Sequence, residues 1–155
     1  MLPWNGTVTN AGGNADLWEI NPADDKPVRL WGFVLGQTSE VADAQEEGLR
    51  ITVKRLRATV TSSNGTAGTA EAADEANLAP SLSWEYNGAT VATTTGDTET
   101  LAELGWNNRQ TPFDFWYPDE RFCPKVVQGE ALVIRLEDTV ADDMTFVGMA
   151  FVEEI

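Results

Sequence analysis

The sequence predicts an all-β protein: a single-domain β-sandwich of jelly-roll or Greek-key-like topology, with one short helix and long surface loops. Three observations carry this prediction. Short apolar runs typical of strands recur along the chain, helical periodicity is scarce, and the connections are uneven in length and rich in small polar residues. The chain of 155 residues is long enough to bury a substantial core without disulfides or metals.

The first fifteen residues differ in composition from the rest of the chain. They are rich in Asn, Gly and Thr and carry one large side chain, Trp4. We expect an extended N-terminal arm at residues 1–15, followed by the sandwich domain at 16–155. Trp4 either packs locally or docks the arm on a neighbouring molecule.

The strand predictions depend on the spacing of apolar residues. Residues 28–35 (VRLWGFVL) form a bulky run typical of a buried strand. Residues 49–60 alternate but change phase, which predicts a β-bulge near Lys54–Arg55, because a regular strand keeps its phase. Residues 131–137 (ALVIRLE) also alternate. Residues 144–152 (MTFVGMAFV) are apolar on both faces, as expected for a covered central strand. Shorter strands are expected at Leu17–Ile20, Ser81–Tyr86 and Thr90–Thr94.

One helix is expected, at Thr98–Leu104. Asp97 or Thr98 can cap its start, acidic residues occupy the first turn, and Gly105 follows the last residue. Two long surface loops are expected, an acidic one at 41–48 and one at 62–79 with almost no large side chain.

Charge restricts the classes of partner. Ten Lys and Arg residues face 25 Asp and Glu residues, which leaves a net charge of −15. Such a charge disfavours binding to nucleic acid and to anionic membranes, although it equally serves solubility alone. Lys54, Arg55 and Arg57 cluster, and we expect a salt-bridged sheet face there. With no signal-peptide pattern and no apolar run of membrane-spanning length, the expected product is soluble and made in the cytoplasm.

The inventory of reactive side chains argues against an enzyme. The chain contains no histidine, and Cys123 is its single cysteine, expected to be a small buried apolar residue. No phosphate-binding glycine motif is present, so no cofactor is predicted. Carboxylates are the plentiful reactive group, but adjacent pairs do not face each other across a cleft as a glycosidase requires. The dense pairs, expected in solvated turns, are Asp24–Asp25, Glu46–Glu47, Glu137–Asp138 and Asp142–Asp143.

Calcium is the metal worth weighing, because hard cations take carboxylate and carbonyl oxygens from loops. Asp138, Asp142 and Asp143 fall within one predicted hairpin. Their spacing matches no EF-hand loop, and an ordinary acidic turn explains the same residues.

The segment TPFDFWYPDERF, residues 111–122, concentrates five large aromatic rings between prolines. An irregular segment with so many rings must be covered, either by its own domain or by a neighbour. Aromatic residues with Arg are also the composition that protein interfaces enrich. The candidate protein-interface residues are Trp4, Phe113, Phe115, Trp116, Tyr117, Arg121 and Phe122.

The chemistry of these rings predicts how deeply each one lies. We expect some rings to fill the open end of the sandwich and others to meet a neighbouring subunit. The three phenylalanines have no polar atom and should be the more deeply buried. Trp116 and Tyr117 each carry a polar group and should lie nearer the interface. We expect Arg121 to pair with a carboxylate across the contact.

A carbohydrate-binding module is the alternative function. Planar rings on an exposed sandwich face stack on sugars, while amide and guanidinium groups bond the hydroxyls. The candidate glycan contacts lie just before the aromatic segment: Trp106, Asn107, Asn108 and Arg109.

Four segments, RLWGFVLGQTSE (29–40), GLRITVKRL (48–56), LGWNNRQTPFDFWYPDERF (104–122) and GEALVIRLE (129–137), give the chain a resemblance to a known group. From about Asp16 to the C-terminus it resembles the head decoration, or cement, proteins of tailed bacteriophages. The resemblance implies a jelly-roll-like sandwich on the capsid exterior of the virion, often trimeric. The implied partners are the major capsid protein and other copies of the chain. It implies no active-site residue and no cofactor.

Overall fold

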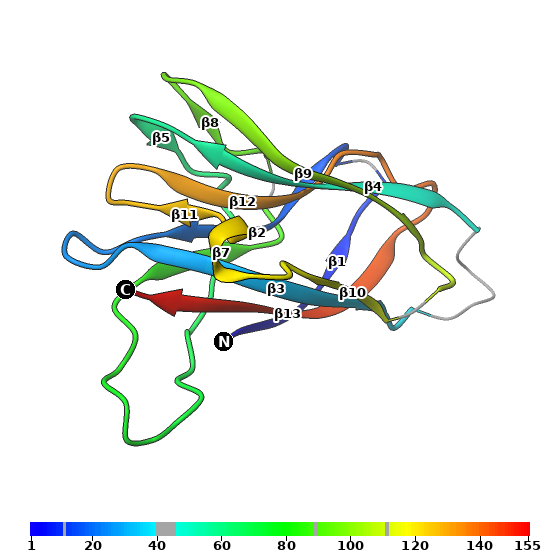
Figure 1. The fold of residues 1–155 in the computed structure, drawn as a ribbon. Helices are drawn as coiled ribbons and strands as arrows, with labels where there is room; N and C mark the ends of the chain where they lie inside the picture. Colours follow the sequence, from blue (N-terminus) through cyan, green and yellow to red (C-terminus); the bar gives the residue numbers. More distant parts are fainter. Residues whose placement is uncertain (11, 40–45, 89, 111) are drawn as a thin grey trace.

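The computed structural model describes residues 1–155 except 11, 40–45, 89 and 111. Two antiparallel β-sheets pack face to face (Figure 1). The elements, in chain order, are β1 (Leu2–Val8), β2 (Ala15–Asn21), β3 (Val28–Gln37), β4 (Gly48–Leu56), β5 (Val60–Thr61), β6 (Thr66–Ala67), β7 (Ser83–Tyr86), β8 (Thr93–Thr94), β9 (Thr98–Asn107), β10 (Phe113–Trp116), the 3-10 helix η1 (Glu120–Phe122), β11 (Lys125–Val126), β12 (Ala131–Leu136) and β13 (Met144–Glu154).

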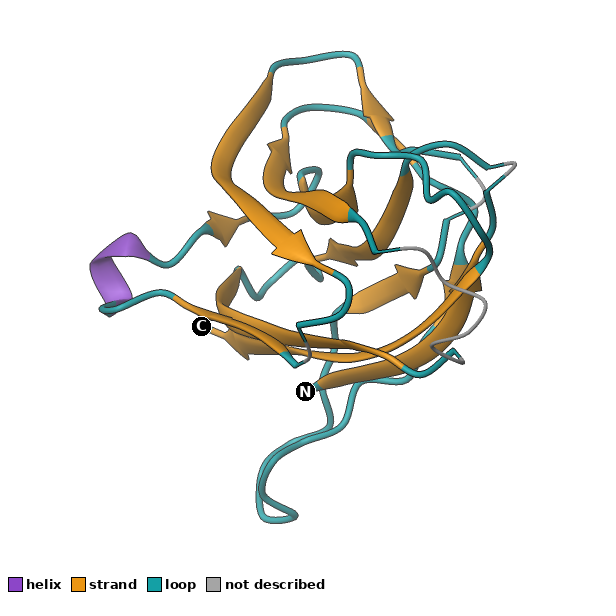
Figure 2. Cartoon of the chain, turned by 90° about the vertical axis from the view of Figure 1, so that its right-hand side faces the viewer, coloured by secondary structure: helices purple, strands orange, loops and turns teal. Residues whose placement is uncertain are grey.

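The strand order is that of a jelly roll. Sheet A has the order β1-β13-β3-β10, with β11 also beside β3, sheet B has the order β6-β7-β2-β12-β4-β9, and β5 and β8 form a separate two-stranded sheet. Among the eight principal strands, the chain changes sheet at every connection except the one from β4 to β9, which gives two interleaved Greek keys. The view in Figure 2 shows the two layers. The predicted all-β sandwich is therefore confirmed.

The core lies between the two sheets and is rich in aromatic rings. Trp18 of sheet B packs against Phe33 of sheet A with ring centroids 6.0 Å apart, and its indole N–H donates to the carbonyl of Leu2 at 3.0 Å. Gly148 of β13 leaves room for this indole, because a Cβ there would lie 2.6 Å from the nearest ring atom. Strand alternation thus fills the interior from both layers.

The segment predicted as a helix, Thr98–Leu104, is instead part of strand β9. It pairs with β4 along its whole length, and its acidic side chains bond across to arginines, Glu103 to Arg50 at 3.0 Å and Glu99 to Arg55 at 2.9 Å. Cross-strand pairing therefore outweighs the local helix signals. Among the described residues the only helix is the single turn η1, and none is long and apolar enough to cross a bilayer.

The expected arm at residues 1–15 is also corrected. Its Leu2–Val8 portion is strand β1, which pairs with β13 at the edge of sheet A. Trp4 is buried inside the protein, 5.5 Å from both Trp18 and Tyr86. Residues 2, 4 and 8 all face the core, so the segment has the period of two that a strand requires.

The remaining local predictions are mostly confirmed. The register between β4 and β9 shifts at Val53/Lys54, but the extra residue is Leu101 on β9. Strand β4 keeps its register with β12 through Leu56, which packs with Ala131 and Val133 on the face opposite Val53, so the predicted change of phase within 49–60 is wrong. The segment 62–79 is a surface loop apart from the two-residue strand β6, and the acidic connection at 41–48 lies mainly outside the described residues. The basic cluster forms the expected salt bridges with glutamates: Lys54–Glu137, Arg55–Glu99, Arg57–Glu99 and Arg57–Glu130.

Candidate docking surface

The aromatic segment forms an edge of sheet A. Strand β10 pairs with β3, and its side chains alternate between the two faces of the sheet. Phe113 and Phe115 turn inward and contact Phe33, with ring centroids 5.8 and 5.7 Å apart. Trp116 turns outward and is 46% exposed. The segment expected to be irregular is therefore a strand at Phe113–Trp116, and Phe113 and Phe115 lie deeper than Trp116, as expected.

The predicted order of burial is wrong for two rings. Phe122 is 63% exposed, because it ends the short η1 turn outside the sandwich. Tyr117 packs edge-on against Phe115 at 5.0 Å, and no described residue bonds its buried hydroxyl. Burial raises the pKa of Tyr117 above its ordinary value. The hydroxyl therefore does not mark a boundary position here.

The charged part of the segment is satisfied locally. Arg121 pairs with Asp119 at 2.9 Å, and the same carboxylate accepts the Arg121 backbone N–H at the start of η1. Hydrogen bonds from the side chain and backbone of Arg121 lower the pKa of Asp119. Cys123 is buried, as expected, and burial raises the pKa of its thiol.

The side chain of Trp116 on β10 lies over the neighbouring strand β3 and contacts Phe151 on β13. Trp116 and Phe151 are both in register with Gly32 of the intervening strand β3. Their ring centroids are 4.6 Å apart and tilted by 40°. A Cβ at Gly32 would lie 2.7 Å from the Trp116 ring and 2.4 Å from the Phe115 carbonyl oxygen. The absence of a side chain at position 32 therefore permits the aromatic pair.

These two rings belong to an apolar outer face of sheet A. Val147, Met149 and Phe151 share one side of β13 by strand alternation, opposite the buried Phe146 and Ala150. Val147 is 42% exposed. We name this face the outer-face patch. Its members are Trp116 and Val147, which are exposed, and four half-buried residues, Trp31, Val34, Met149 and Phe151.

The expectation that residues 144–152 form a strand covered on both faces is only half right. Strand β13 is central, between β1 and β3. Its inner side chains contact the core, but its outer ones have no second β-layer of described residues over them (Figures 1 and 2). Strand β13 is thus apolar on both faces, but only its inner face is covered by a second sheet.

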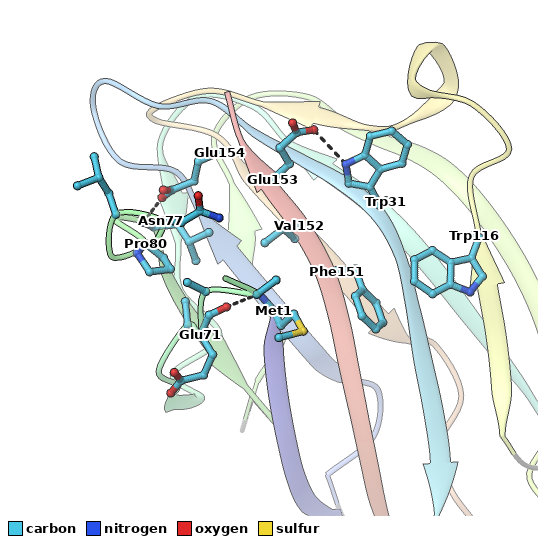
Figure 3. A pocket seen from close by; sticks show the side chains of 15 residues that line it. Met1, Trp31, Glu71, Asn77, Pro80, Trp116, Phe151, Val152, Glu153 and Glu154 are labelled. Atoms are coloured by element: carbon cyan, nitrogen blue, oxygen red, sulfur yellow. Dashed lines mark hydrogen bonds between the residues drawn. The ribbon is translucent and has the colours of Figure 1, made fainter. Parts of the chain in front are cut away.

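A groove of about 730 Å³ runs beside the patch (Figure 3). Trp116, Phe151 and Trp31 line one end, and the segment 70–80 lines the other. The Trp31 indole N–H donates to the Glu153 carboxylate at 3.0 Å, which holds that ring in place. The groove is therefore bounded by aromatic rings on the sheet and by a projecting loop.

The loop that bounds the groove is tied to sheet A at both ends. Glu71 and Met1 exchange backbone hydrogen bonds at 3.0 and 2.8 Å. Glu154 accepts the backbone N–H groups of Ser81 and Leu82 at 2.8 and 2.7 Å and the Ser81 hydroxyl at 2.9 Å. Burial alone would raise the pKa of Glu154, but these bonds and the charge of Lys26 lower it. The groove is therefore preformed.

The candidate glycan contacts do not form a sugar platform. Trp106 is 4% exposed, packs against Phe113 and Phe146, and donates its indole N–H to the Gln110 carbonyl. Asn108 is buried, and its side-chain oxygen accepts the Glu47 N–H at 3.0 Å. Of the other two candidate glycan contacts, Asn107 is half-buried and Arg109 is exposed. A buried indole cannot stack on a sugar ring, so the prediction is wrong.

The acidic hairpin residues bond backbone amides. Asp138 accepts the Arg50 N–H at 2.6 Å, and Asp143 accepts the Asn10 N–H at 2.9 Å. Within the described ranges, no group of three or more His, Cys, Asp or Glu residues is placed to hold a metal ion, and Asp142 belongs to no such group. The arrangement is that of a hydrogen-bonded turn.

Sequence reasoning missed three features of this surface: Trp31, Phe151 and the groove wall at 70–80. A glycine inside the apolar run 28–35 was an available signal, because a glycine within a strand often marks a close approach. Comparison of the chain with protein-family models, curated proteins and solved structures finds no match.

Proposed function

We propose that this chain is a non-enzymatic virion structural protein that decorates and stabilises a phage capsid. It binds the outer surface of the major capsid protein lattice through the outer-face patch. The observation that carries the proposal is the apolar outer side of the central strand β13, at Val147, Met149 and Phe151, which no second β-layer of described residues covers. A contiguous apolar face of this kind marks an interaction site.

Two further points support the proposal. Two of the segments that resemble phage decoration proteins contribute to this face beside β13, since 29–40 contains Gly32 and 104–122 contains Trp116. Jelly-roll sandwiches occur in viral structural proteins, although the fold alone does not establish a function. Many copies on one particle add their binding energies, so each individual interface can be modest.

Mass spectrometry of purified virions, from the phage that encodes the chain, tests this function. The proposal expects the protein at a copy number comparable to that of the capsid lattice sites. Mixing the purified protein with capsids that lack it should restore saturable binding in a sedimentation assay. Absence from the virion together with no binding to capsids would sink the proposal.

We also propose that the chain acts as a homotrimer, as the resemblance implies. Light scattering of the purified protein should then give three times the 16.9 kDa of one chain. A monomer that still binds capsids would remove the trimer and leave the decoration function standing.

A further inference from the structure

The groove has two chemically different ends. At one end, the adjoining rings of Trp116 and Phe151, tilted by 40° to each other, offer an apolar surface. At the other end, the loop carries Glu71, Asp74 and Glu75, with the side chain of Leu78 projecting at 85% exposure. Of the three glutamates that line the groove, Glu153 and Glu154 pair with Arg29 and Lys26. The negative charge at the loop end comes from Glu71, Asp74 and Glu75 and is offset in part by the Met1 ammonium beside Glu71. An occupant therefore meets apolar rings first and negative charge at the far wall.

Most cations of the chain are already neutralised by its own carboxylates. Among the described residues, eight Lys and Arg residues form salt bridges with nine acidic residues. None of these salt bridges involves Glu71 or Glu75, although the Met1 ammonium interacts with the charge of Glu71. A second copy that brought its own acidic loop to this groove would place like charges together, and like charges repel. Charge complementarity favours a basic partner.

The two ends of the groove lie in one row across sheet A. Trp116, Gly32 and Phe151 are in register on β10, β3 and β13. Phe151 follows Ala150, whose partner is Leu2, and the adjacent Met1 bonds the backbone of Glu71. Four steps of about 4.8 Å separate Trp116 from Glu71, or roughly 19 Å. An extended chain covers that span in about six residues.

From this row we propose the chemistry of the segment that occupies the groove. It is an extended protein segment with an apolar or aromatic side chain over Trp116 and Phe151. A Lys or Arg about six residues away faces Glu71. The inference rests on the proposed function, because it describes the part of the major capsid protein that the chain grips.

Binding to capsids at two salt concentrations tests the inference. Trp116→Ala should weaken binding roughly 30-fold at both concentrations, as loss of a central interface anchor does. Glu71→Lys should weaken binding roughly tenfold in 50 mM NaCl, and the loss should shrink in 500 mM NaCl, where charges are screened. Glu103→Lys is the matched control: it makes the same charge change on the outer side of sheet B and should bind within about twofold of the wild type.

A photo-reactive amino acid in place of Leu78 identifies the occupant. After irradiation on capsids, the crosslinked peptide should come from the major capsid protein and contain an apolar residue with Lys or Arg about six positions away. A crosslink to a second copy of the chain would overturn the inference. So would a capsid peptide that lacks a basic residue.

The two proposals fail in different ways. If the wild-type protein does not bind capsids, the decoration function falls, and the inference falls with it. If the wild type binds and the Trp116→Ala and Glu71→Lys proteins bind equally well, decoration stands and this groove is not the docking site. Circular dichroism of each variant confirms that it is folded before binding is measured.

Discussion

The outer faces of the two sheets differ in chemistry although both sheets share one core. On sheet B, charged side chains pair with one another, as Arg50 does with Glu103 and Lys54 with Glu137. On sheet A, the corresponding positions carry the outer-face patch of aromatic and aliphatic side chains. Charged pairs satisfy one another in water, whereas exposed apolar side chains gain free energy only when something covers them.

Sheet B also provides its own cover where it is apolar. Ala131 and Val133 face outward on β12. They form a small second cluster with Leu56 and Ala92. No comparable second cluster lies over the patch on sheet A within the described part of the chain. Within the described part of the chain, the apolar part of one outer face is covered by the chain itself, and that of the other is not.

The largest expected effect concerns the buried ion pair beneath the cover of sheet B. Arg135 bonds Asp16 at 2.5 Å and the Ala92 carbonyl at 2.8 Å, and the Ala92 N–H donates to Asp16. Arg135→Ala leaves the buried carboxylate unpaired and should lower the free energy of unfolding by about 3–5 kcal/mol, measured by urea denaturation. A loss below about 1 kcal/mol would show that water or a shifted loop compensates.

A smaller loss is expected at the centre of sheet A. Gly32→Ala places a Cβ against the Phe115 carbonyl and the Trp116 ring, which should cost about 1–3 kcal/mol and alter tryptophan fluorescence. Gly105→Ala is the matched control, because a Cβ at that strand glycine meets nothing within 4 Å. Equal effects of the two changes would mean that close packing at Gly32 is unimportant.

Acid should loosen the groove wall through Glu154. The pKa of Glu154 is lowered in the folded state. The ionised carboxylate therefore stabilises the fold above the ordinary pKa of 4.5, and this stabilisation is lost as the pH falls through the pKa of the folded protein. Glu154→Gln should cost about 1 kcal/mol at pH 7 and should flatten the loss of stability between about pH 5 and 3. Hydrogen exchange at the Leu82 amide reports the change locally.

Glu137 on sheet B separates this local effect from general acid denaturation. Burial alone would raise the pKa of Glu137, but the hydrogen bonds from Lys54 and Thr52 lower it. As with Glu154, the stability that this carboxylate provides is therefore lost as the pH falls. Glu137→Gln should therefore affect acid stability while leaving exchange at Leu82 unchanged. Faster exchange at Leu82 in both variants would contradict a local role for Glu154.

The smallest effects are expected from truncations on the two outer faces. Trp116→Ala should lower the free energy of unfolding by about 1 kcal/mol, because half of the ring is already exposed and mainly the contact with Phe151 is lost. Arg50→Ala, which removes an exposed ion pair, should cost less than about 0.5 kcal/mol. If Trp116→Ala costs as much as a core truncation, the ring is structural and the patch loses its main argument.

The sequence by itself determined the class of fold and much of the local structure. Alternation predicted the strands at 28–35 and 131–137, because the period of two is a local property of an extended chain. The chemistry of the rings predicted that Phe113 and Phe115 lie deeper than Trp116. Alternation was misleading at 49–60, where Leu56 packs on the outer face of a strand that keeps its phase. It did not predict the strand at 98–104, where local helix signals competed with it.

Only the tertiary structure decided which side chains share a surface. Trp116 and Phe151 are far apart along the chain. Their rings contact each other because β10 and β13 flank β3 in register at Gly32. The groove opposite them exists because Glu71 and Glu154 tie a polar loop to the same sheet. Register and loop attachment depend on contacts between distant segments, so no local pattern specifies them.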